Sequence, residues 1–252
     1  MNILSCNSIK GIGKYNNDIM NNIDNFCYVI DGASSLFNDN LFYKTSDLYE
    51  YMKLLKDNIS DIGLINDNLI DGIKKSNKHL SGLNKYKEYE LPTFTIAAVK
   101  ENKDNCELYL LCDCLISILY TDGRIENIED HRFDPIKTKC RKEIAEIDKL
   151  ELSMEEKIEL KRPIWRKYRK FANAINGYPV GSTNPNSIKE GIIKTINKKN
   201  IDKIIICTDG LYSKIGLPKD KSYFEQNILE EKILNTKNND DLTYILIDVK
   251  GR

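Results

Sequence analysis

Near the end of the chain lies Lys203-Ile204-Ile205-Ile206-Cys207-Thr208-Asp209-Gly210-Leu211, an apolar run that leads straight into an acidic turn. Consecutive β-branched residues predict a strand that is buried on both faces. Asp209-Gly210 predicts the turn at which this strand ends. Further along, Asp240-Asp241 precedes a second predicted strand, Leu242 to Val249. We therefore expect carboxylates at the tips of two buried strands.

Two more aspartates follow apolar strands in the same way. Tyr28-Val29-Ile30 leads into Asp31-Gly32, and the run from Leu108 to Cys112 leads into Asp113. Carboxylates at several strand tips repel one another if they converge without partners, and divalent cations relieve that repulsion. Hard cations such as Mg²⁺ and Mn²⁺ favour oxygen ligands of this kind. The sequence therefore predicts a metal site where these strands end.

The bulk properties limit the classes of function. The 252 residues contain no Pro/Gly/Ser-rich linker, so we expect one domain. Lys plus Arg (38) balances Asp plus Glu (38), and we expect no nucleic-acid partner. No apolar run approaches the ~20 residues that cross a bilayer, and no signal peptide opens the chain, so we expect no membrane partner. Seven scattered cysteines, an odd number, favour a reducing, cytoplasmic setting.

Periodicity along the chain predicts an α+β layered sandwich. Helical spacing occurs over 46–59, 66–80, 187–198 and 223–234, and strand-like runs occur at 3–9, 26–30, 92–99, 106–112, 115–120 and 124–128. Residues 141–176 are charged and helical in pattern, and Pro163 predicts a helix break or a fresh start within that stretch. Paired helices that flank antiparallel strands are typical of layered α+β folds.

Seven short motifs carry the resemblance to a known family. They are Lys14-Tyr15-Asn16-Asn17-Asp18-Ile19, Val29-Ile30-Asp31-Gly32-Ala33, Pro92-Thr93-Phe94-Thr95-Ile96-Ala97, Cys112-Asp113-Cys114, Asp130-His131, Thr208-Asp209-Gly210-Leu211 and Asp240-Asp241-Leu242-Thr243. In this order they resemble the metal-dependent type 2C Ser/Thr protein phosphatases, the PPM family. The resemblance implies a four-layer α-β-β-α sandwich of two antiparallel sheets flanked by helices. We expect a single domain over 1–252, with a helical flap or insert at about 132–182.

The resemblance implies a metal pair held by backbone and carboxylate oxygens. Asp31 would bridge two Mn²⁺ or Mg²⁺ ions, and the Gly32 carbonyl would help to hold one of them. Asp209 and Asp240 would complete the shell of the other ion. Two such ions lower the pKa of a bridging water and clamp the phosphoryl oxygens, so that hydroxide attacks phosphorus without a phosphoenzyme.

Three further residues complete the implied site, and each departs from the family pattern. Asp18 stands where the family has Glu and would bind the second metal directly or through water. Asp113, between cysteines instead of Gly and Ser, would lie beside the pair with room for a third, looser ion. Lys14 replaces the usual Arg at the substrate phosphate and offers a mobile point charge instead of a bidentate donor. Ala33 stands where many eukaryotic members have a histidine.

Three functions remain open from the sequence. The first is a monomeric phosphatase that acts on phosphoserine or phosphothreonine in a phosphorylated protein, with Asp31, Asp209 and Lys14 in catalytic roles. The second is a weak or silent phosphatase-like module that binds a phosphoprotein or a protein partner. The third is an unrelated metal-dependent hydrolase of small phosphate esters. Cys112 and Cys114 are interpreted as core thiols, and the basic run 162–170 as a solvated helix face.

Overall fold

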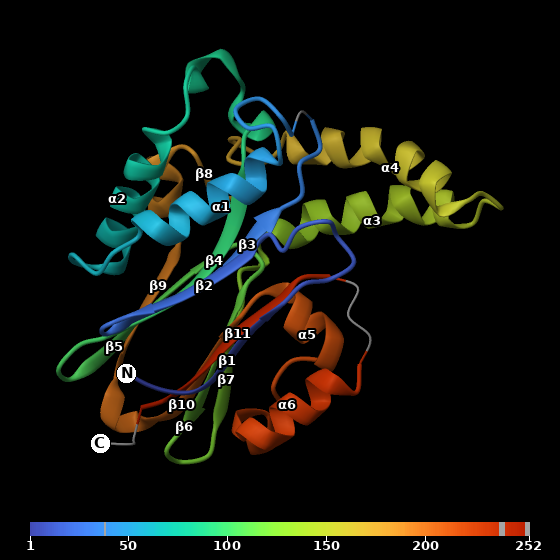
Figure 1. The fold of residues 1–252 in the computed structure, drawn as a ribbon. Coiled ribbons are helices and arrows are strands. Elements are labelled where there is room, and N and C mark those ends of the chain that lie inside the picture. Colours follow the sequence, from blue (N-terminus) through green and yellow to red (C-terminus); the bar gives the residue numbers. More distant parts are fainter. Residues whose placement is uncertain (38, 237–239, 250–252) are drawn as a thin grey trace.

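In the computed structural model, which describes residues 1–37, 39–236 and 240–249, two antiparallel sheets pack face to face (Figure 1). One sheet has the order β1-β11-β10-β6-β7, formed by Asn2–Ile9, Leu242–Asp248, Ile201–Cys207, Leu115–Tyr120 and Ile125–Ile128. The other has the order β2-β3-β4-β5-β9, formed by Asp18–Ile23, Phe26–Ala33, Thr93–Glu101, Asn105–Leu111 and Ile192–Asn197. A short strand, β8 (Gly181–Ser182), pairs with β4.

Helices cover the outer face of each sheet. α1 (Asp47–Asn58) and α2 (Ile65–Asn77) pack on the sheet that contains β3, whereas α5 (Asp209–Ile215) and α6 (Gln226–Leu234) lie on the sheet that contains β10 (Figure 1). Tyr28 and Ile30 of β3 contact α1 and α2, and Val29 between them contacts the opposite sheet. Both faces of the central strands are therefore buried. The predicted α-β-β-α sandwich is confirmed.

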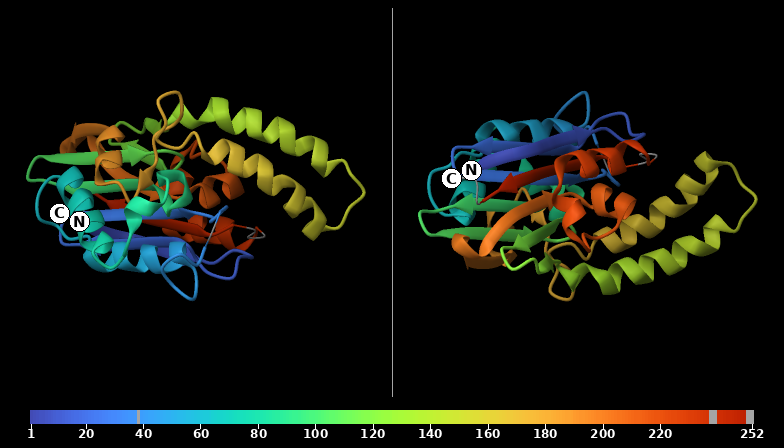
Figure 2. Two further views of the ribbon diagram at one scale, coloured as in Figure 1. Left: turned by 90° about the horizontal axis from the view of Figure 1, so that it is seen from above. Right: turned by 90° about the horizontal axis from the view of Figure 1, so that it is seen from below.

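Two long helices form an antiparallel pair that projects from one end of the sandwich (Figure 2). They are α3 (Asp134–Asp148) and α4 (Met154–Arg169). The predicted break or fresh start at Pro163 is wrong, because α4 continues through it. Proline removes one helical N–H donor, but the Ser153–Glu156 capping box fixes the start of the helix, and Tyr168 packs into the body near its end. No helix in the described ranges combines the length and the apolar character needed to cross a membrane.

The predicted helix over residues 187–198 is also wrong. A 3₁₀ segment, η4 (Pro185–Glu190), is followed by the edge strand β9. The isoleucines in this stretch fit both periods, and pairing with the free edge of β5 decides for a strand. Gly191 permits the change of direction, because a Cβ there would overlap the ring of Tyr109. The remaining 3₁₀ segments are η1 (Leu83–Lys85), η2 (Glu88–Glu90), η3 (His131–Phe133), η5 (Lys198–Asn200) and η6 (Lys221–Phe224).

Candidate metal centre

The ends of strands from both sheets bring the predicted aspartates together. Asp18, the first residue of β2, lies opposite Asp31 of β3 in the antiparallel register. Asp209 begins α5 and is separated from the end of β10 by one residue, and Asp240 lies just before β11, which pairs with β10. Burial, followed by the charges of Asp18, Asp209, Asp113 and Asp240, raises the pKa of Asp31 well above its ordinary value. Distant segments of the chain therefore place five carboxylates within electrostatic reach of one another.

Burial and neighbouring charges also raise the pKa values of Asp18 and Asp209. Burial raises the pKa of Asp18 from 3.8 to about 7, with the charge of Asp241 adding to the effect. Burial also raises the pKa of Asp209 to about 7, and the charge of Asp113 contributes next. At neutral pH the metal-free centre therefore holds protons that ordinary aspartates release.

Asp18 has one satisfied oxygen and one unsatisfied oxygen. The Thr208 hydroxyl donates to Asp18 Oδ2 at 2.8 Å, while Asp18 Oδ1 is buried without a hydrogen-bond partner among the described residues. A buried carboxylate oxygen without a partner is costly. The role of Thr208 could not be predicted from the sequence, because a threonine before an Asp-Gly turn gives no signal that its hydroxyl points at a distant strand.

A lysine from the projecting helices reaches into the centre. Lys137 of α3 lies with its Nζ 3.1 Å from Asp113 Oδ2 and 3.9 Å from Asp209 Oδ2. The Tyr212 hydroxyl donates to the backbone carbonyl of Asp113 at 2.7 Å. Burial lowers the pKa of Lys137, but the charges of Asp113 and Asp209 outweigh burial and raise it overall. Nothing in the local sequence around Lys137 predicted this contact.

Asp113 lies in a turn between β5 and β6. Cys112 has φ 63°, in the left-handed region, and its N–H donates to Asp130 Oδ2 at 3.0 Å. Cys112 and Cys114 are therefore part of a turn after β5 and not of a continuing strand. Both thiols are buried, as predicted, and burial raises the pKa of each.

The donor set fits hard divalent cations. It consists of carboxylate oxygens, one of them buried without a partner, and their mutual repulsion is the kind that a cation relieves. Among the described residues, no three acidic, histidine or cysteine side chains surround a common point. Instead, Thr208 and Lys137 serve as partners of Asp18 and Asp113. Mg²⁺ keeps several of its waters and needs only one or two carboxylates, so this arrangement is compatible with it.

The loop that carries Lys14 is held by Asp241. The Asp241 carboxylate accepts from Gly11 N at 2.8 Å and from Asn17 N at 2.7 Å. A side chain on Gly11 would overlap the backbone of Asp240, so the loop lies tightly against the start of β11. Lys14 is exposed, and its Nζ lies 5.0 Å from the centre of the Tyr15 ring. The sequence predicts no role for Asp241 beyond its place next to Asp240. In the structure it holds the loop through two backbone hydrogen bonds.

Replacing Asp241 with alanine is expected to lower the free energy of unfolding by about 3 kcal/mol. Two backbone donors lose a charged acceptor, and each such bond contributes on the order of 1.5–3 kcal/mol. Urea denaturation of both proteins measures the change. The exposed Asp104 lies in the turn at the far end of β4, so Asp104→Ala serves as a control that should change stability by less than about 0.5 kcal/mol. Equal stability of the two variants would contradict the clamp.

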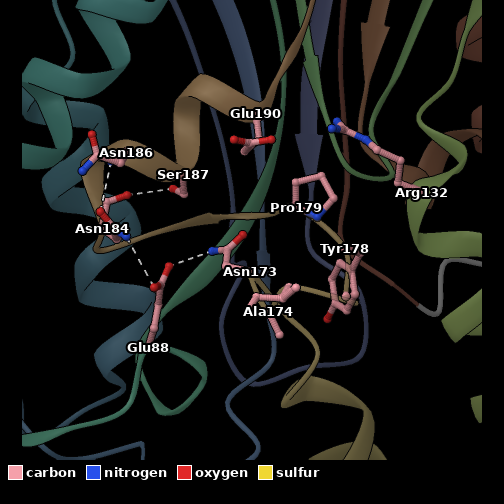
Figure 3. A pocket seen from close by; sticks show the side chains of 12 residues that line it. Glu88, Arg132, Asn173, Ala174, Tyr178, Pro179, Asn184, Asn186, Ser187 and Glu190 are labelled. Carbon is pink, nitrogen blue, oxygen red and sulfur yellow. Dashed lines mark hydrogen bonds between the residues drawn. The ribbon is translucent and has the colours of Figure 1, made fainter.

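Among the pockets of the described residues, one lies away from the carboxylates and another lies beside them. The first, of about 380 Å³, is lined by residues that include none of the predicted site residues (Figure 3). In it Asn173 donates to Glu88 at 2.7 Å, which ties the end of α4 to η2. The second, of about 250 Å³, lies between α3, α4 and Leu36 and is lined in part by Lys137. Only the second pocket shares a residue with the metal centre.

Solved structures of bacterial phosphatases share this fold. The Ser/Thr phosphatase Stp1 from Staphylococcus aureus superposes with a TM-score of 0.59 and 15% identity, over 100% of this chain and 96% of that chain. The PPM Ser-Thr phosphatase MsPP from Mycobacterium smegmatis, in complex with cacodylate, gives 0.57 and 14% identity over 98% and 99%. The chain has the PPM phosphatase fold. No family model matches the sequence, and a search of curated proteins finds no match.

The PPM fold is shared with a protein that carries metal. The catalytic domain of the Ser/Thr protein phosphatase PstP, solved in complex with two manganese ions, superposes with a TM-score of 0.54 and 12% identity over 97% of this chain and 96% of that one. The likeness to these PPM structures thus extends over nearly the whole length of each chain. At these identities it establishes the fold, and the activity of this chain has to be argued from its own residues.

Proposed function

We propose that the protein is a metal-dependent phosphatase that hydrolyses phosphoserine or phosphothreonine in proteins. The observation that carries this proposal is the convergence of five aspartates from both sheets, with the pKa of Asp31 raised well above its ordinary value. A cluster of this kind is costly in a folded protein unless cations use it. Several proteins that share the fold are Ser/Thr phosphatases, which supports the same reaction class here.

The proposed ligands are arranged around Asp31. Asp31, Asp209 and Asp240 would hold two Mn²⁺ or Mg²⁺ ions together with Asp18 and the Gly32 carbonyl. Gly32 cannot carry a side chain, because a Cβ there would lie 2.8 Å from the Asn17 carbonyl oxygen. The bound ions would supply an activated water and neutralise charge on the phosphoryl group.

The remaining residues of this chain orient the centre and its substrate. Thr208 fixes one oxygen of Asp18 and leaves the other free to face a cation. Asp241 holds the loop of Lys14, which we propose contacts the substrate phosphate. The protons that Asp18, Asp31 and Asp209 retain must leave as ions bind, so metal binding is expected to release protons.

The pocket beside Lys137 supports a polypeptide substrate. Its lining includes three cationic side chains, Lys137, Arg141 and Arg169, together with the aromatic rings of Trp165 and Tyr168. Such a surface can accept the chain on one side of a phosphorylated residue, where a small phosphate ester would leave it empty. All seven cysteines lie within the described residues and are free, which supports a reducing, cytoplasmic setting.

Activity on a small aryl phosphate tests the proposed function directly. Purified protein with Mn²⁺ should release phosphate, excess EDTA should stop the reaction, and Asp209→Asn should lower kcat/KM on the order of 10³-fold, about 4 kcal/mol of transition-state stabilisation. Asp104→Asn, at an exposed position far from the centre, should leave the rate unchanged. Circular dichroism should show that both variants are folded. Equal activity in EDTA and in Mn²⁺ would refute the proposal.

One observation favours the alternative of a silent phosphatase-like module. Lys137 already pairs with Asp113, and the described carboxylates do not surround a common point. A module of this kind would bind a phosphoprotein or a protein partner without turnover. Calorimetry that shows no binding of Mn²⁺ or Mg²⁺ at millimolar concentration, in a normally folded protein, would support it over the enzyme.

A further inference from the structure

Lys137 is the cation that α3 contributes to the centre. Its side chain is 25% exposed, and those of Asp113 and Asp209 are 20% and 27% exposed, so water screens the three groups only in part. Arg141, one helical turn further on, faces the same pocket, and Lys137 Nζ lies 5.6 Å from the centre of the Phe133 ring. The ammonium group therefore points from the helical pair toward the sheets and not into solvent.

With two divalent ions bound, Lys137 brings the charge of the centre close to neutral. Its five ionised aspartates would carry five negative charges: Asp18, Asp31, Asp113, Asp209 and Asp240. Two divalent ions supply four positive charges, and Lys137 supplies the fifth. Asp241, a sixth carboxylate nearby, accepts from two backbone N–H groups and adds one further negative charge. A third divalent ion would add a net positive charge next to an ammonium group, which is unfavourable in a partly buried site.

We propose that the ammonium group of Lys137 pairs with Asp113 and occupies the position that a third metal ion would otherwise take. This inference rests on the proposed two-metal function. It has two consequences. Two ions saturate the centre, and the Asp113–Lys137 pair attaches the projecting helices to the metal site. Lys137 acts through Asp113 and Asp209 and is therefore a positioning residue.

Calorimetric titration of the full chain with Mn²⁺ tests the inference without any substrate. The wild type should bind two equivalents. Lys137→Met removes the charge and keeps much of the length, and it should reveal a third site or tighten the weakest one by about tenfold or more. Lys137→Arg keeps the charge and should bind two equivalents. Lys139→Met, at an exposed position of the same helix, is the matched control and should also bind two.

A second variant keeps the test decisive if Lys137→Met alone alters folding. Adding Asp113→Asn to Lys137→Met removes the carboxylate that the third ion would use, so the double variant should return to two equivalents. Hydrogen exchange in EDTA should show faster exchange at the start of α3 in Lys137→Met than in Lys139→Met. A wild type that binds three ions, or a Lys137→Met protein that binds two with unchanged affinity, would overturn the inference while leaving the phosphatase proposal intact. A wild type that binds no Mn²⁺ would refute both.

Discussion

Asp31→Asn is expected to lower kcat/KM for a phosphate ester by about 10³-fold or more, without destabilising the metal-free protein. The amide keeps the shape of the carboxyl group but carries no charge and cannot bridge two cations. A loss of that size corresponds to about 4 kcal/mol of transition-state stabilisation. In EDTA the substitution removes a partly buried acid whose pKa is raised by desolvation and by four neighbouring aspartates.

Thermal unfolding with and without Mn²⁺ separates these two effects. In EDTA, Asp31→Asn should unfold at the same temperature as the wild type or higher, whereas the increase that Mn²⁺ gives the wild type should be lost. Asp122→Asn, in the exposed turn between β6 and β7, is the control and should keep both the Mn²⁺ effect and the activity. Activity of Asp31→Asn within tenfold of the wild type would exclude a bridging role for this residue.

The strands that carry Asp31 and Asp209 could be predicted because their signals are local. An uninterrupted apolar run followed by Asp-Gly predicts both that the strand is buried and where it ends. The convergence of the two aspartates followed from the resemblance, and the packing of the two sheets, which brings the charge of Asp209 beside Asp31, now supplies its geometric basis. The stretch 187–198 was assigned wrongly because the same isoleucines satisfy a helical and a strand period, and only the free edge of β5 decides between them.

Thr208, Lys137 and Asp241 could not be identified from the sequence, for a different reason. Each acts on a group far away in the chain: Thr208 on Asp18, Lys137 on Asp113, and Asp241 on the loop that precedes β2. Their residue types are common on protein surfaces, so composition and spacing carry no signal of their roles. The direction in which α3 leaves the sandwich decides whether Lys137 meets a carboxylate or water. That direction is a property of the packed core.

In EDTA, the free energy of unfolding is expected to fall as the pH rises from about 4 to about 7. Burial raises the pKa of Asp18 and of Asp209 from 3.8 to about 7. Well below pH 3.8 both groups are protonated in the folded and the unfolded chain, and their contribution to stability is fully present. As the pH rises, the unfolded chain releases these protons first, and the contribution is lost by the time the pH passes the folded pKa. Each group accounts for at most about 4 kcal/mol, and because the carboxyls share protons the sum is smaller.

Chemical denaturation at half-unit steps of pH, in EDTA and in Mn²⁺, measures this dependence. Groups whose pKa is lowered, such as Asp130 beside Arg132, act in the opposite direction, but their contribution is lost only as the pH falls toward 4 and below. Asp18→Asn should therefore flatten the profile between pH 4.5 and 7. A metal-free wild type whose stability rises over that interval would contradict the crowding of the carboxylates. With Mn²⁺ the slope should reverse, because cations bind the ionised groups and bind them more tightly as protons leave. The same crowding that weakens the empty centre at neutral pH is then the source of its affinity for metal.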